Sequence, residues 1–300
     1  MSLLSSTQGT PARVWSLVGA VAANGGELSR SDAQDWLNPG FLENGQEVRE
    51  KTSTFGQTLG AATSLGAVRQ EAGLLRLEPS CVVTTFADFC DWVHERLVTL
   101  DSHEKDAVVL ETYSYVAVES HRQGSLGFVH DWAAKRLADE ADRALPDGAD
   151  DDGERRINPT KLPTWRRWLD CLGLSLPLPG LTQSHPSADG RLAREIPRFG
   201  LREDGIGAEV AAHDFLQRLA RRLPYLDGGN MFAETSRRIG HAPGDRQLSP
   251  LLSASLRNLH DEGIFELRLR GDAGSVVRLW PEASHRIQTF HAVHVPEESA

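Results

Sequence analysis

The side chains best suited to chemistry in this chain are polar and basic residues on a strongly marked helix near the C-terminus. A serine–proline pair opens this helix and a glycine ends it, over residues 249–263. Arg257 and Asn258 are predicted on its solvent face, where they can bond base edges or phosphates in a DNA major groove. His260 adds a further polar contact. The helix is therefore a candidate DNA-recognition helix.

Two β-strands are predicted after this helix, and both carry arginines. Arg268 and Arg270 share one face of the first strand, and Arg278 lies on the second. Together they would form an edge directed at DNA phosphates. The alternative is a solvated face balanced by nearby glutamates, because arginines and acids are equal in number in this part of the chain.

A second basic cluster, over residues 155–167, includes Arg166 and Arg167 and is interleaved with Trp165 and Trp168. Such a surface can bind phosphates and stack on bases. Helical spacing instead places both tryptophans inward and the arginines outward, close to an acidic tract of opposite charge. We favour a buried core with surface ion pairs, and keep the two arginines as a second candidate DNA contact.

Two patterns invite comparison with metal sites. The acidic tract at residues 139–154 contains DGADDDG, but Gly148 stands where a calcium loop requires its first carboxylate. His285, His291 and His294 lack accompanying cysteines or a helical zinc motif. We expect an exposed acidic loop, a surface or packed histidine tail, and no metal site.

Catalytic motifs are missing from the sequence. It contains no G-x-S-x-G, no G-x-x-x-x-G-K-[ST], and no G-x-G-x-x-G between a strand and a helix. Carboxylates are plentiful, but no spacing selects an acid–base pair. We therefore expect a non-catalytic protein without cofactors.

The composition is that of an ordinary globular protein. Its 300 residues are 40% hydrophobic and 25% charged, which excludes a collagenous, coiled-coil or wholly disordered chain. The net charge is −10, of which the tract at residues 139–154 carries −7 and the rest −3. Cys81, Cys90 and Cys171 form no disulfide framework and are interpreted as reduced thiols. With no apolar span or signal peptide in the sequence, we expect a cytoplasmic protein without a membrane partner.

The N-terminal part of the chain has the pattern of three helices followed by a hairpin. The helices are predicted over residues 12–23, 29–37 and 54–65, and the strands over residues 67–70 and 74–77. This order is the winged-helix arrangement. Acids outnumber basic residues here, so we assign this part to protein contact rather than DNA.

The rest of the chain is predicted to be mainly helical. Residues 85–144 follow a helical pattern, and Pro163 can open a further helix before a linker at residues 177–197 and another helix at 209–223. The expected fold is mainly α with small β-hairpins, in which tandem winged-helix units flank a helical middle region. The predicted domains cover residues 1–82, 83–205 and 206–300.

The C-terminal run of residues 248–281 resembles the recognition helix and wing of bacterial winged-helix proteins, through Leu256 and Leu259 followed by Gly263. The N-terminal unit resembles a shorter version of the same pattern. Whether the middle region contains a third such unit is left open. More narrowly, the domain order with INPTKLPTWRRWLDCLGL resembles the DpdG-like proteins. These are accessory proteins of bacterial clusters that insert 7-deazaguanine derivatives into DNA and act in phage defence. The resemblance implies modification and restriction proteins as partners and supplies no catalytic residue.

These observations favour a DNA-associated accessory subunit of a bacterial DNA-modification or anti-phage system. Its expected partners are double-stranded DNA, through the C-terminal domain, and other protein subunits of the same system. The alternatives are a stand-alone winged-helix transcription regulator and a pure protein–protein scaffold.

Overall fold

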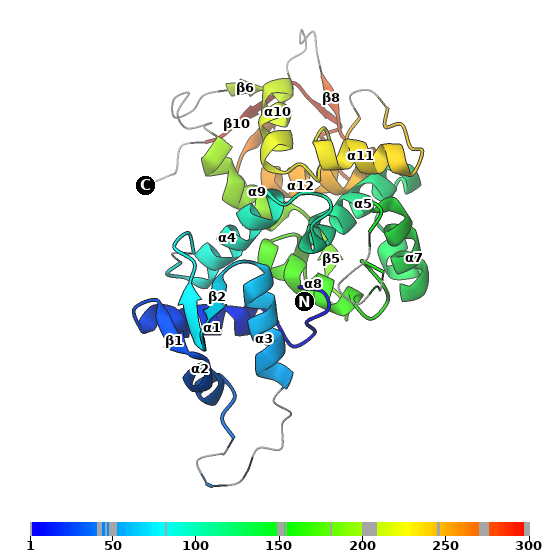
Figure 1. Cartoon of the computed structure of the whole chain (residues 1–300). Helices are drawn as coiled ribbons and strands as arrows, with labels where there is room; N and C mark the ends of the chain where they lie inside the picture. Colours follow the sequence, from blue (N-terminus) through cyan, green and yellow to red (C-terminus); the bar gives the residue numbers. More distant parts are fainter. Residues whose placement is uncertain are drawn as a thin grey trace. The chain divides into compact units, whose positions relative to one another are not determined.

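The protein is mainly helical with small antiparallel sheets, as predicted (Figure 1). The structure, a computed structural model, describes residues 2–40, 44–45, 47, 53–81, 83–148, 153, 155–180, 182–199, 209–244, 247–269 and 276–296. The chain divides into two compact units, Met1–Val109 with Gly148–Cys171, and Leu110–Asp147 with Leu172–Ala300. The helical middle region, predicted over residues 83–205, contributes residues to both units.

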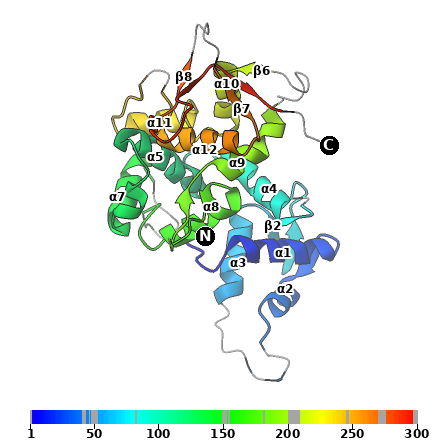
Figure 2. The same cartoon turned by 180° about the vertical axis from the view of Figure 1, so that it is seen from behind.

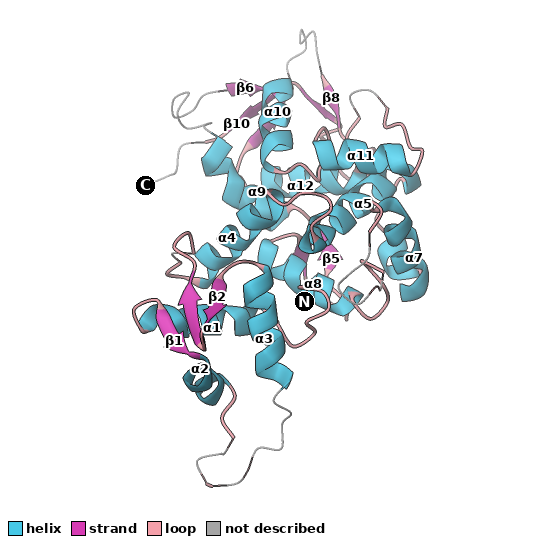
Figure 3. Ribbon diagram, in the orientation of Figure 1, coloured by secondary structure: helices cyan, strands magenta, loops and turns pink. Residues whose placement is uncertain are grey.

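The first unit begins with the predicted three helices and hairpin, and adds one short strand. The elements are α1 (Pro11–Ala23), β1 (Glu27–Ser29), α2 (Arg30–Leu37), α3 (Ser53–Ser64), β2 (Val68–Glu71) and β3 (Leu74–Leu77). The strands form an antiparallel sheet in the order β1-β3-β2, drawn in magenta in Figure 3. The sequence pattern missed β1 because it is only 3 residues long.

Local chemistry explains where these elements begin and end. The Ser29 hydroxyl accepts a hydrogen bond from the Asp32 N–H and caps α2. Ala72 and Gly73 both have positive φ, at 49° and 82°, which suits the two-residue turn between β2 and β3. These signals are short-range, so the sequence alone located the hairpin.

The remaining helices of the first unit pack around buried aromatic residues. They are α4 (Phe86–Val98), the short helix η1 (Lys105–Ala107) and α8 (Leu162–Leu172), which ends in the second unit. Trp165 and Trp168 are buried, as the favoured interpretation predicted. The buried Asp106 carboxylate accepts hydrogen bonds from the Leu3 N–H and the Ser64 hydroxyl, which connects η1 to the N-terminal segment and α3.

The second unit contains most of the helices and three of the small sheets. Its elements are α5 (Val108–Gln123), which begins in the first unit, α6 (Phe128–Asp131), α7 (Ala134–Ala144), β4 (Ser175–Leu176), β5 (His185–Pro186), α9 (Asp189–Glu195), η2 (Ile196–Phe199), β6 (Glu209–Ala211), α10 (Ala212–Arg222), α11 (Asn230–Arg238), α12 (Pro250–Asp261), β7 (Glu266–Arg268), β8 (Val277–Arg278), β9 (Thr289–Phe290) and β10 (Ala292–His294). Helices α9 and α12 lie side by side, as Figures 1 and 2 show.

Part of the second unit, residues 189–294, repeats the element order of residues 11–77 in the first unit. The sequence α9, β6, α10, α12, β7, β10 corresponds to α1, β1, α2, α3, β2, β3, and the sheet order β6-β10-β7 corresponds to β1-β3-β2. The short helix η2, helix α11 and the β8-β9 pair are additions to this plan. The middle strand β10 pairs Val293 with Val210 on one side and with Leu267 on the other.

The predicted C-terminal wing is wrong in its pairing. We expected the strand ending at Arg270 to form a hairpin with the strand at residues 275–280. In the described residues, β7 pairs instead with β10, and β8 pairs with β9. Pairing with β10 allows the apolar side of β7, at Leu267, to meet Val293 in the buried part of the sheet.

The predicted linker at residues 177–197 is also wrong, because β5 and α9 lie within it. Its sequence is turn-rich. Two of the fully buried side chains of α9, Arg191 and Glu195, are charged, so the buried face of this helix lacks the usual apolar pattern. Gly173, just after α8, and Gly190, in α9, allow the backbones at these two positions to approach closely because neither residue has a Cβ. A Cβ added at Gly173 would stand 2.9 Å from the Arg191 nitrogen.

None of the three cysteines forms a disulfide, and all are buried, at 1%, 1% and 6% exposure for Cys81, Cys90 and Cys171. Burial, with a smaller contribution from the Glu78 charge, raises the pKa of the Cys81 thiol to about 11. Because the thiolate is the reactive form, we expect an aromatic disulfide reagent to label the native protein slowly at about pH 8. The same reagent should count three thiols in denaturant. Rapid, complete labelling of the native protein would contradict this burial.

Within the part of the chain that the structure describes, no helix is both long enough and apolar enough to cross a membrane.

Candidate nucleic-acid interface

The predicted recognition helix, α12, is mostly buried. Leu252, Leu256 and Leu259 form the core stripe that the sequence predicted. Three positions of α12 are exposed, Ala254, Asn258 and Asp261. A helix that reads a major groove needs a wider polar face than this, and Asp261 would repel phosphates. The burial of α12 therefore disfavours base reading by this helix.

Arg257 is the clearest correction to the predicted site. It is 5% exposed rather than on the solvent face. Its guanidinium donates to the Ile287 and Trp280 carbonyls at 3.0 and 2.8 Å, and to the Gln288 side chain at 3.2 Å. Burial lowers its pKa. Arg257 anchors the segment around β8 and β9 to α12, which the sequence could not reveal because two of its three partners are backbone carbonyls.

The other two residues predicted on α12 make contacts within the unit. The Asn258 side-chain amide donates to the Asp189 carboxylate at 2.8 Å, which links α12 to α9. His260 is half-buried, and its Nδ1 accepts from the Leu267 N–H at 3.2 Å, which links α12 to β7. Both side chains thus hold the helix against its neighbours.

The strand pairing separates the arginines that were predicted to form one edge directed at DNA phosphates. Arg268 forms ion pairs with Glu266 at 2.7 Å and with Glu209 at 3.1 Å, so two carboxylates offset its charge. Arg270 lies outside the described residues. Arg278 is exposed on β8, which pairs with β9 in a separate sheet, so the structure does not place it beside Arg268 as a wing hairpin would.

The basic cluster of the first unit is largely internal. Arg156 is buried and donates to the Glu104 carbonyl at 3.0 Å, and buried Lys161 donates to the Arg155 carbonyl at 2.7 Å. Arg167 is exposed and donates to the Thr7 carbonyl at 3.2 Å, while burial lowers the pKa of Arg166. Because Trp165 and Trp168 are buried, they cannot stack on bases.

The C-terminal histidines do not converge. His285 pairs with Asp261 at 3.1 Å, and His291 lies 3.5 Å from Glu209. His294 belongs to β10, with its Nδ1 buried. Among the described residues, no group of three His, Cys, Asp or Glu side chains could hold a metal ion.

The structure brings together a different set of arginines, which we call the Glu195 cluster. The Glu195 carboxylate, fully buried at the end of α9, lies 3.4 Å from Arg191, 3.4 Å from Arg198 and 2.8 Å from Arg222. Arg191 is fully buried, whereas the side chains of Arg198 and Arg222 are 37% and 39% exposed. One carboxylate thus faces three guanidinium groups.

The elements that carry this cluster are electropositive. Helix α9, η2 and α10 together hold six arginines against three acids, or +3 with histidine neutral. Arg221, exposed beside Arg222, extends the surface. Guanidinium groups at this density suit phosphate oxygens. The sequence did not reveal this surface, because α9 and part of η2 lie in the segment predicted to be a linker. Arginines spaced three or four apart, at Arg191, Arg194 and Arg198, were the available signal.

The fold and this surface define a mainly helical protein with a repeated helix-and-sheet plan and an arginine-rich face on its second unit. The model of the DpdG-like family matches residues 1–273, so the chain belongs to that family. No curated protein and no solved structure matches it.

Proposed function

We propose that this protein is a non-catalytic accessory subunit of a bacterial DNA-modification system with a role in phage defence. It would act in the cytoplasm, associate with double-stranded DNA and dock other protein subunits. Membership of the DpdG-like family is consistent with a place in such a system. The observation that carries the DNA contact is the excess of arginine over acid in the Glu195 cluster.

We further propose that the repeated plan represents two winged-helix modules, one in each unit. Its support is the common element order and the matching sheet orders β1-β3-β2 and β6-β10-β7. The modules would serve different partners. The small uncharged residues on α3, such as Gly56, Gly60 and Thr63, favour protein contact for the first. The arginines favour DNA contact for the second.

The proposed DNA contact is to phosphates rather than to base edges. Burial of α12 leaves little of that helix to enter a groove, whereas Arg198 and Arg221 are exposed on η2 and α10. Phosphate contacts supply affinity without sequence preference, and they weaken steeply with salt. The protein should therefore bind duplexes of unrelated sequence about equally.

The double variant Arg198→Ala/Arg221→Ala tests this surface. We expect weaker binding to a random duplex at low salt, and a salt slope smaller by about one for each lost phosphate contact. Fluorescence anisotropy measures both quantities. Both arginines are exposed, and Arg191 and Arg222 remain to neutralise Glu195, so the circular dichroism spectrum should be unchanged.

The matched control is Lys135→Ala/Arg143→Ala, which removes the same charge from exposed positions of α7. It should bind as the parent does. If both double variants keep the parental affinity and slope, the α9–α10 surface is not the DNA contact. Absence of any DNA affinity in the parent at low salt would instead support a pure protein scaffold.

A stand-alone transcription regulator remains the alternative. It would form a dimer and protect a palindrome with half-sites about one helical turn apart. An accessory subunit would bind DNA weakly alone and copurify with DNA-modification enzymes from its native host. Footprinting of a palindrome by a purified homodimer would overturn the proposal.

A further inference from the structure

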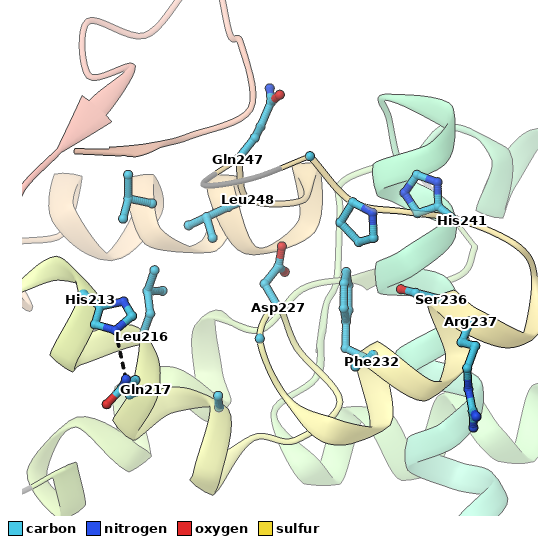
Figure 4. A pocket seen from close by; sticks show the side chains of 16 residues that line it. His213, Leu216, Gln217, Asp227, Phe232, Ser236, Arg237, His241, Gln247 and Leu248 are labelled. Atoms are coloured by element: carbon cyan, nitrogen blue, oxygen red, sulfur yellow. Dashed lines mark hydrogen bonds between the residues drawn. The ribbon is translucent and has the colours of Figure 1, made fainter. Parts of the chain in front are cut away.

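A cavity of about 770 Å³ opens in the second unit, between α10, α11 and the segment that leads into α12 (Figure 4). This volume falls within the range of sites for small molecules, about 300 to 1,000 Å³. None of the residues that line the cavity belongs to the Glu195 cluster or to the proposed DNA contact.

Apolar side chains form most of the wall. Leu216 and Ala220 come from α10, Phe232 from α11, and Leu248 and Val277 from the segments beside α12. Figure 4 shows Leu216 and Leu248 on one side and the Phe232 ring on the other. An apolar wall with one aromatic ring favours an aromatic ligand, which gains both burial and ring contact there.

A buried hydroxyl marks the polar side of the cavity. Ser236 is 3% exposed and points toward the cavity in Figure 4, and its oxygen has no hydrogen-bond partner among the described residues. A buried polar group without a partner is costly, so a ligand that satisfies it gains affinity. The hydroxyl can donate one hydrogen bond to an acceptor on that ligand.

The charged groups limit what the ligand can be. Both oxygens of the buried Asp227 carboxylate accept from Ser249, at 2.6 Å from its N–H and 2.7 Å from its hydroxyl. That carboxylate therefore holds Ser249, the N-cap residue of α12, and is not an open site for a cation. Burial, and to a smaller extent the nearby His121, lowers the pKa of His241, which favours the neutral form of its ring. Arg237, at the rim, adds one positive charge.

From this geometry we infer that the cavity is a binding site for an aromatic small molecule that is neutral or singly anionic. The ring would lie between Leu216 and Phe232, and an acceptor atom would take the hydrogen bond of the Ser236 hydroxyl. Such a ligand would give the protein a function beyond docking DNA and partner proteins.

Anilinonaphthalene sulfonate, an aromatic monoanion, is a suitable probe. We expect the folded protein to bind one equivalent with enhanced fluorescence. Ala220→Trp, which fills the cavity from α10, should weaken binding by about tenfold or more. Ser236→Ala keeps the apolar wall and should weaken it by about fivefold, the value of one hydrogen bond.

Glu234→Trp is the matched control, because it adds the same side chain at an exposed position of α11 outside the cavity lining. It should bind the probe as the parent does. Ala233→Trp, at the mouth of the cavity, replaces Ala220→Trp if that variant fails to fold. The inference is overturned if the parent binds no probe, or if a folded cavity-filling variant binds it as tightly as the parent.

Discussion

Replacing Glu195 by glutamine is expected to lower the free energy of unfolding of the second unit by about 3 to 5 kcal/mol. The substitution keeps the size of the side chain but removes the charge that faces Arg191, which is fully buried on the same helix. A buried cation without its anion retains the cost of desolvation and loses the compensating attraction. Urea unfolding followed by circular dichroism measures the change.

The control is Glu234→Gln, which breaks the ion pair with Arg238 on the surface of α11. Exposed pairs contribute about 0 to 1 kcal/mol, so its unfolding midpoint should move little. Equal shifts for the two variants would mean that the Glu195 cluster is no more important for stability than a surface pair.

Replacing Trp165 by alanine is expected to destabilise the first unit by about 3 to 5 kcal/mol. The indole is 1% exposed, and its N–H donates to the Val109 carbonyl at 3.0 Å. The variant loses the buried apolar area, leaves a cavity and removes the donor to a buried carbonyl. Thermal unfolding reports the loss as a lower midpoint.

The same substitution at Trp36 is the matched control, because that side chain is 57% exposed on α2. Surface substitutions usually change stability by no more than about 0.5 kcal/mol. Comparable losses at Trp36 and Trp165 would contradict the assignment of Trp165 to the core.

The sequence alone determined those elements whose signals are local. Ser29 and Ser249 cap α2 and α12, and Ala72 and Gly73 form the turn that connects β2 to β3. Each signal acts within a few residues and needs no distant partner. The buried faces of α8 and α12 could also be predicted from the sequence, because helical periodicity determines which side chains share a face.

Only the tertiary structure decided the strand pairing and the use of the charged side chains. Strand β7 pairs with β10, more than twenty residues away, because sheet pairing depends on burial against distant elements rather than on sequence order. The same holds for the arginines. Arg257 is buried because backbone carbonyls of another segment accept its hydrogen bonds, and Arg191 because Glu195 offsets its charge. The sequence shows which side chains are charged. Only the fold supplies the partners that offset the free-energy cost of burying those charges.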